Sequence, residues 1–88
     1  MGDKRMAVST ENAAAEIREW LRDNVTGGRQ VPPDEPLIEN GVLTSLQTVE
    51  LVTFLEERFD IIVEDEEFDE ENFGSVEAIA SLVASKTG

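Results

Sequence analysis

The chain has 88 residues, which suffices for one domain with a modest core and is too short for a second domain. It contains no cysteine and no histidine, so disulfide bonds, thiolate metal sites and the commonest general base are excluded. The formal net charge is −13, and such an acidic surface repels nucleic acid and anionic membrane, so we expect basic protein partners.

The chain is also expected to be cytoplasmic and monomeric. No stretch approaches the roughly 18 apolar residues of a membrane helix, and residues 1–5 lead into polar sequence rather than an apolar signal core. We predict a single domain over residues 1–88, with residues 1–9 as a disordered tail. A chain this short has difficulty holding lysine or carboxylate groups in a dry, preorganised pocket, so it is predicted not to be an enzyme.

A first helix is predicted to begin after Ser9 and Thr10, which are good N-cap residues, and to end near Thr26. The pair Gly27-Gly28 stops its pattern. Its apolar residues recur at spacings of three and four, with Trp20 at the edge of the stripe. The stripe consists of Ala13, Ala14, Ile17, Leu21 and Val25.

A long loop is predicted from Gly27 to Thr44, because this segment has no helical period, contains three prolines and includes the Asn40-Gly41 turn signal. A connection of this length inside a compact domain is unusual. Four apolar residues explain it, since they can pin the loop over a core: Leu37, Ile38, Val42 and Leu43.

A second helix is predicted to start at the capping box formed by Thr44 and Gln47, and to end near Phe59 or Asp60. Its inner face is expected to comprise Leu46, Val49, Val52, Leu55 and Phe59, widened by Leu51 and Phe54. Its outer face is expected to be mainly polar, with Gln47, Glu50, Thr53, Glu56, Glu57 and Arg58.

The segment 61–63 is β-branched, yet no second strand-like run can pair with it, so we expect a buried extended linker. Residues 64–72 are almost wholly acidic, and one or two helical turns anchored by Phe68 and Phe73 are predicted there.

Ser75 is expected to cap a final helix, with Glu77 in its first turn and Lys86 near its end. The buried side of this helix should consist of Val76, Ile79, Ala80, Leu82 and Val83. The predicted fold class is therefore all-α: a small four-helix bundle with three main helices, one short third helix and a long first loop.

The negative charge is concentrated in one third of the chain. Residues 1–30 carry five acids and five bases, whereas residues 45–73 carry eleven acids and the single base Arg58. Taken alone, such a run is ordinarily a solvated surface that keeps a protein soluble.

Three segments of the chain resemble the attachment region of acyl carrier proteins: Gly41–Leu46, Thr48–Val52 and Leu55–Phe59. The resemblance continues through the acidic linker into Asn72–Val76 and covers roughly residues 12–86. It is strongest to discrete carriers of polyketide or related secondary-metabolite pathways, some of which hold extender units or aminoacyl groups; fatty acid and antibiotic biosynthesis use related carriers.

The resemblance implies that Ser45 receives a 4′-phosphopantetheine arm from coenzyme A and carries a thioester on it. The implied partners are a phosphopantetheinyl transferase and an acyltransferase, ligase or ketosynthase with a basic docking surface. No metal site and no catalytic residue are implied. In the family, the helical bundle can also open slightly to admit an acyl chain. In this chain, the simplest role for the predicted core stripe is packing of the hydrophobic core. The stripe consists of Val49, Val52, Leu55, Ile62, Ile79 and Val83.

The chain departs from the family at Thr44, where an aspartate usually precedes the serine. Both residues cap a helix, but threonine lacks the carboxylate that lies beside the bound metal and basic residues of the transferase. Recognition by a housekeeping transferase is therefore expected to change. Gln47 and Thr53, where relatives often carry an acid and a larger apolar residue, are expected to alter partner choice.

The residues themselves support a role for Ser45. Thr44 already caps the helix, so Ser45 is predicted at the first helical position with its hydroxyl exposed, where a phosphodiester would meet unpaired amides and the positive end of the helix dipole. Leu46 is either core or a small apolar partner contact. The acids Glu50, Glu56 and Glu57 are predicted to form an acidic strip for basic partners, rather than merely solvated charge.

Two alternative functions remain open from the sequence. The run Asp60 to Glu71 suggests a calcium-binding helix pair, although it lacks the alternating ligands around a glycine at position six of the loop. The chain could also be an acidic adaptor that works without modification.

Overall fold

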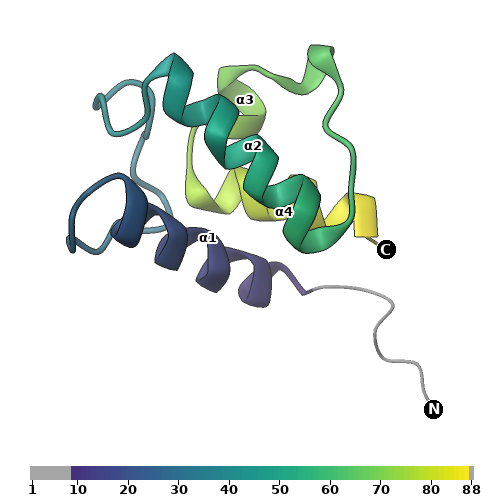
Figure 1. The fold of residues 1–88 in the computed structure, drawn as a ribbon, viewed down its shortest axis with the longest axis horizontal. Helices are drawn as coiled ribbons and strands as arrows, with labels where there is room; N and C mark the ends of the chain where they lie inside the picture. The colour runs from purple at the N-terminus through teal and green to yellow at the C-terminus, as the bar shows by residue number, and fades with distance from the viewer. Residues whose placement is uncertain (1–8, 88) are drawn as a thin grey trace.

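The computed structural model describes residues 9–87, which form four α-helices and one 3₁₀ turn (Figure 1). The bounds are α1 Thr10–Asn24, α2 Ser45–Phe59, η1 Asp65–Glu67, α3 Glu70–Phe73 and α4 Val76–Thr87. The all-α prediction, with three main helices and one short third helix, is confirmed, and residues 9–87 contain no strand. The predicted disordered tail lies outside the described residues except for Ser9, whose hydroxyl accepts a hydrogen bond from Asn12 N at 3.0 Å and caps α1.

Helix α1 ends at Asn24, two residues before the predicted end. The backbone N–H groups of Val25 and Thr26 both donate to the carbonyl oxygen of Leu21, each at 2.9 Å, which closes the last turn. Gly27 follows at φ +70°, a left-handed conformation that glycine adopts without a steric penalty.

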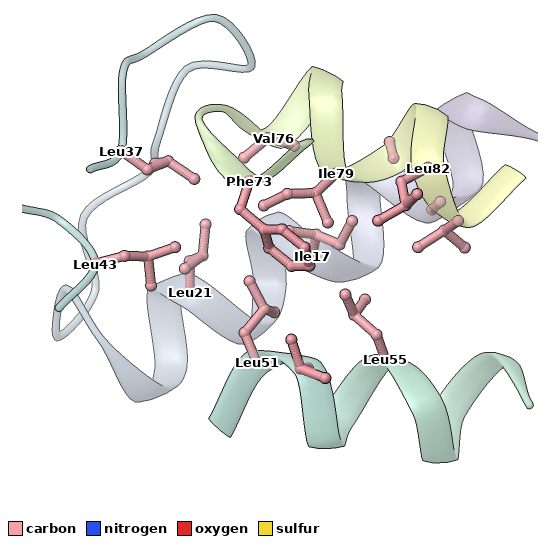
Figure 2. Packing of buried hydrophobic residues seen from close by; sticks show 14 of the residues in the cluster. Ile17, Leu21, Leu37, Leu43, Leu51, Leu55, Phe73, Val76, Ile79 and Leu82 are labelled. Carbon is pink, nitrogen blue, oxygen red and sulfur yellow. The ribbon is translucent and has the colours of Figure 1, made fainter. Parts of the chain in front are cut away.

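The buried side chains of all four helices and of the long loop form one hydrophobic cluster (Figure 2). Helix α1 contributes Ala13, Ile17 and Leu21, and α4 contributes the five residues predicted for its buried side. Phe73 projects from α3 into the centre of this cluster and is 1% exposed. The predicted stripes of the first and last helices are therefore confirmed.

The long loop is fastened to the rest of the fold, as its apolar residues predicted. Leu37 and Leu43 are buried, Ile38 and Val42 are half-buried, and Val31, which the sequence did not single out, is also buried. Burial of these side chains holds the loop against the core.

Two backbone hydrogen bonds also join the loop to the start of α4. Leu37 N donates to Gly74 O at 2.7 Å, and Glu77 N donates to Pro33 O at 3.0 Å. A side chain at position 74 would collide with the carbonyl oxygen of Glu70, so this corner requires glycine.

The inner face of α2 differs from the prediction at its start. Leu51, Val52 and Leu55 are buried as expected, but Leu46 is 68% exposed and Val49 is 52% exposed. Thr48 occupies the inner face instead, and its hydroxyl donates to Thr44 O at 2.8 Å. Apolar residues lie around most of this helix, so its spacing alone does not say which part faces the core.

The linker after α2 is extended, as predicted, but only its first and third residues are buried. Ile61 and Val63 pack into the core, while Ile62 between them is 69% exposed because successive side chains of an extended chain point to opposite sides. The predicted packing roles of Val49 and Ile62 are therefore wrong.

Glu67 ties the acidic segment to α4. Its carboxylate accepts hydrogen bonds from Lys86 Nζ at 2.9 Å and from Glu64 N at 2.8 Å. The contact with Lys86, followed by the hydrogen bond from the Glu64 backbone, lowers the pKa of Glu67 below its ordinary value of 4.5.

This lowered pKa predicts a loss of stability at acid pH. The stabilisation from Glu67 is fully present above about pH 4.5, the ordinary pKa, and is lost as the pH falls through the lowered pKa. Glu67→Gln should therefore lower the melting temperature at pH 7 and have a smaller effect at pH 3. Thermal unfolding followed by circular dichroism checks this, with Glu66→Gln in the same turn as the control. An equal loss for Glu67→Gln at both pH values would contradict the prediction.

Within residues 9–87, none of the helices is both long enough and apolar enough to cross a membrane.

Candidate functional site

The start of α2 has the capping box predicted from the sequence. Thr44 Oγ1 accepts a hydrogen bond from Gln47 N at 3.2 Å, and the Gln47 side-chain oxygen accepts one from Thr44 N at 3.1 Å. Thr44 has an extended backbone with φ −88° and ψ 173°, so Ser45 is the first helical residue.

Ser45 is exposed, as predicted, and no group among residues 9–87 forms a hydrogen bond with its hydroxyl. A helix leaves its first backbone N–H groups without partners inside the helix, and the capping box takes up those of Thr44 and Gln47. The N–H groups of Ser45 and Leu46 remain beside the hydroxyl. A phosphodiester on Ser45 Oγ would therefore meet backbone donors and the positive end of the α2 dipole.

An open groove of about 330 Å³ lies next to Ser45, between α2 and the segment that forms α3. Its apolar part includes the ring of Phe68, which is 39% exposed and stacks on buried Phe73 with ring centroids 5.5 Å apart. The groove is lined by Ile38, Ser45, Thr48, Val49, Phe68, Asp69, Glu70 and Phe73. It offers an attached group an apolar surface beside the serine.

Four of the predicted partner-binding residues share the outermost side of α2. Leu46, Glu50, Thr53 and Glu57 are all exposed, and their spacings of four, three and four residues align them along one face. We call these four residues the α2 crest. The first turn of α2 contains no acid, so the crest is apolar beside Ser45 and acidic further along.

Three other predicted partner-binding residues have structural roles in α2. Thr44 and Gln47 form the capping box. Glu56 is half-buried, and its carboxylate accepts a hydrogen bond from Val63 N at 3.0 Å, which places it beside the linker rather than with Glu50 and Glu57. The predicted strip is therefore reduced to two acids on the crest.

The sequence did not assign Val49, Phe68, Asp69 and Glu70 to the site, although all four line the groove. The only signal in the sequence is the ring of Phe68 within an acidic run, and that pattern equally predicts an anchor for a helical turn. The approach of residues 68–70 to Ser45 depends on how α3 packs on α4, which no local pattern encodes.

The run proposed as a calcium loop adopts other structures. It begins with Asp60 in the left-handed conformation at φ 58°, continues as the extended linker and η1, and ends inside α3. Among residues 9–87, no group of three or more acidic side chains is placed to hold a metal ion.

Comparison with known proteins identifies the family. The family described as phosphopantetheine attachment site matches residues 14–83, which is most of the chain and includes Ser45. The chain belongs to this family. The predicted resemblance to phosphopantetheine-dependent carriers is thereby confirmed.

Two curated relatives are D-alanyl carrier proteins from Streptococcus suis strains 05ZYH33 and 98HAH33. Each is 46% identical over 50 residues, which is 57% of this chain and 63% of the relative. The match thus spans less than two thirds of the relatives' length.

The matched domain is a site of covalent attachment for 4′-phosphopantetheine, so it acts as a tether and not as an enzyme. The residues present fit this group, because Ser45 offers an exposed hydroxyl, two backbone donors beside it and an adjoining groove.

The contribution of the Thr44 cap to the free energy of unfolding should be measurable. Thr44→Ala removes the acceptor for Gln47 N and is expected to cost about 1 kcal/mol of unfolding free energy, whereas Thr44→Asp should keep the cap. Urea unfolding of the two variants checks this. Equal stability of Thr44→Ala and the unsubstituted protein would contradict the role of the cap.

Proposed function

We propose that the chain is an acyl carrier in which Ser45 bears the 4′-phosphopantetheine arm and presents a thioester to biosynthetic enzymes. The observation that carries this proposal is the exposed hydroxyl at the first position of α2, beside a groove. The proposal takes residues 1–88 as one acyl-carrier domain.

The attachment step requires little of this chain beyond the placement of one hydroxyl. Ser45 Oγ forms the new bond to the phosphorus of coenzyme A's pantetheine phosphate, and the bond from that phosphorus to the nucleotide breaks. The adenosine bisphosphate leaves, and the hydroxyl proton passes to a base of the transferase. The N–H groups of Ser45 and Leu46 and the α2 dipole stabilise the negative charge of the phosphodiester that remains. The arm supplies a terminal thiol for thioester formation.

The α2 crest is the proposed docking surface for partner enzymes. Leu46 is 68% exposed next to Ser45, and a leucine in that position suits an apolar pocket on a partner. Glu50 and Glu57 lie further along the same face and suit basic residues around that pocket. Charge contacts of this kind speed encounter and weaken with salt, so a carrier can leave each enzyme after it has bound.

The cargo that we propose is an aminoacyl group, with D-alanine as the first candidate. Its support is the two relatives, which are D-alanyl carrier proteins and share 46% identity with this chain over 50 residues. The other cargo suggested by the sequence is an acyl or extender unit of a polyketide or related pathway. The mass of the group found on the arm in protein isolated from the native cell separates these two cargoes.

Tryptic peptide mapping tests the attachment site. Cleavage after Arg29 and Arg58 releases a peptide of residues 30–58 in which Ser45 is the only serine. Co-expression with a broad-specificity phosphopantetheinyl transferase should add the mass of one arm to this peptide, and fragmentation should place it on Ser45 rather than on Thr44. An arm on any other peptide would refute the assignment, and a protein that never accepts an arm would favour the unmodified acidic adaptor.

A further inference from the structure

A second open pocket, of about 380 Å³, lies between α1 and α2. Its lining includes four residues of α1, namely Glu16, Glu19, Trp20 and Asp23, and two residues of α2, namely Phe54 and Arg58. Ser45 and Phe54 are nine residues apart on α2, so at 3.6 residues per turn they lie on opposite sides of that helix. The pocket is therefore separate from the groove beside Ser45.

Two aromatic rings line part of this pocket. The rings of Trp20 and Phe54 stack with centroids 5.8 Å apart and an interplanar angle of 25°. Both side chains are half-buried, so part of this paired surface faces the pocket while the rest packs against the core. The face of an aromatic ring carries partial negative charge and attracts cations, tryptophan most strongly.

The walls of the pocket carry an excess of negative charge. They bring three carboxylates together with the guanidinium of Arg58, which is already paired with both oxygens of Glu16 at 2.6 and 2.7 Å. Glu19 and Asp23 are exposed at the rim. Asp23 contacts Arg22 at 3.2 Å, but both groups are exposed to water, so this contact is worth little and is readily exchanged.

The contacts of Arg58 on the same surface illustrate the kind of group that this pocket can bind. Its guanidinium lies 5.8 Å from the centre of the Phe59 ring and pairs with a carboxylate at the same time. A planar guanidinium can stack on a ring and donate in a bidentate manner to a carboxylate, which a lysine ammonium cannot do. The two rings with Glu19 beside them offer the same combination, and Glu19 forms no ion pair within residues 9–87. Asp23 would exchange its exposed contact with Arg22 for the incoming group.

We propose that this pocket is a docking site for an arginine side chain of a partner protein. The guanidinium stacks on the paired rings of Trp20 and Phe54, and the carboxylates of Glu19 and Asp23 accept its hydrogen bonds. Since the pocket faces away from Ser45, it can be filled whether or not the arm is attached. A partner could therefore hold the carrier at a point that does not obstruct the serine.

Trp20 allows a direct test, because it is the only tryptophan and the chain has no tyrosine. The intact protein is titrated with the peptide acetyl-Gly-Arg-Gly-amide at constant ionic strength, and tryptophan fluorescence is recorded. The peptide should produce a saturable change with the unmodified, the arm-bearing and the Ser45→Ala protein alike. The same peptide with neutral citrulline in place of arginine should produce none, and a lysine peptide should bind more weakly.

Matched charge variants show whether the pocket itself is responsible. The double variant Glu19→Gln/Asp23→Asn should weaken arginine-peptide binding by about fivefold. The control Glu39→Gln/Glu77→Gln removes the same charge at two other exposed positions and should change binding by less than about twofold. The proposal is overturned if no saturable change occurs, if citrulline or lysine binds as well as arginine, or if the control weakens binding equally. None of these results affects the assignment of the arm to Ser45, which peptide mapping tests separately.

Discussion

Replacing Ser45 with alanine is expected to give a folded protein that accepts no phosphopantetheine arm. The Ser45 side chain makes no hydrogen bond within residues 9–87 and is exposed, so its loss should change the unfolding free energy by no more than about 0.5 kcal/mol. The capping box involves Thr44 and Gln47 and stays intact. Attachment should nevertheless fall to zero, because alanine has no oxygen that could accept the phosphoryl group. Intact mass after co-expression with a transferase measures this loss.

The control for this variant is Ser81→Ala, which removes another exposed serine, from α4. It should load as completely as the unsubstituted protein. If Ser45→Ala still gained the mass of one arm, Ser45 would not be the attachment site. If both variants lost loading together, the effect would not be specific to Ser45.

Phe73→Ala is expected to have the largest effect on stability. Phe73 is 1% exposed, and its ring lies in the centre of the cluster between α1, α2 and α4 (Figure 2). Truncation of a buried phenylalanine typically costs about 3–5 kcal/mol through lost burial and the cavity that remains. Small domains have a total stability of only about 5–15 kcal/mol, so this loss should remove a large fraction of it. Urea unfolding followed by circular dichroism measures the loss.

Phe68→Ala is the matched comparison, since the two rings stack on each other. Phe68 is 39% exposed, so its removal leaves a shallower defect and should cost about 1 kcal/mol, mainly from the lost stacking and partial burial. A similar loss of stability for the two variants would contradict the central place of Phe73 in the core.

The sequence predicted best those features that depend on neighbouring residues. The capping box at Thr44, the cap at Ser75 and the buried stripes of α1 and α4 are local patterns, and the structure contains all of them. The exposed position of Ser45 followed from the same reasoning, because a helix has one N-cap and Thr44 occupied it.

The predictions that were wrong concern features that depend on packing between distant segments. Helix α2 carries apolar residues on several sides, and its contacts with the other elements decide that Leu51 is buried while Val49 is exposed. Likewise, Glu56 does not lie in the predicted acidic strip, because the linker folds back and places Val63 N beside its carboxylate. The groove lining from Phe68 to Glu70 could not be foreseen for the same reason.

The attachment of the long loop to α4 also limits how far Ser45 can move. The chain between α1 and α2 runs for 20 residues, from Val25 to Thr44, but the hydrogen bonds at Pro33 and Leu37 fix its middle. Only the eight residues from Leu37 to Thr44 then separate this fixed point from the serine. The conformational entropy of a connecting segment grows with its length. The start of α2 is therefore restricted to the range of positions that an eight-residue segment allows, which is smaller than the range that 20 residues would allow. In the proposed function, an enzyme that meets the carrier finds Ser45 within a small volume, and the wide reach that cargo delivery needs comes from the arm itself.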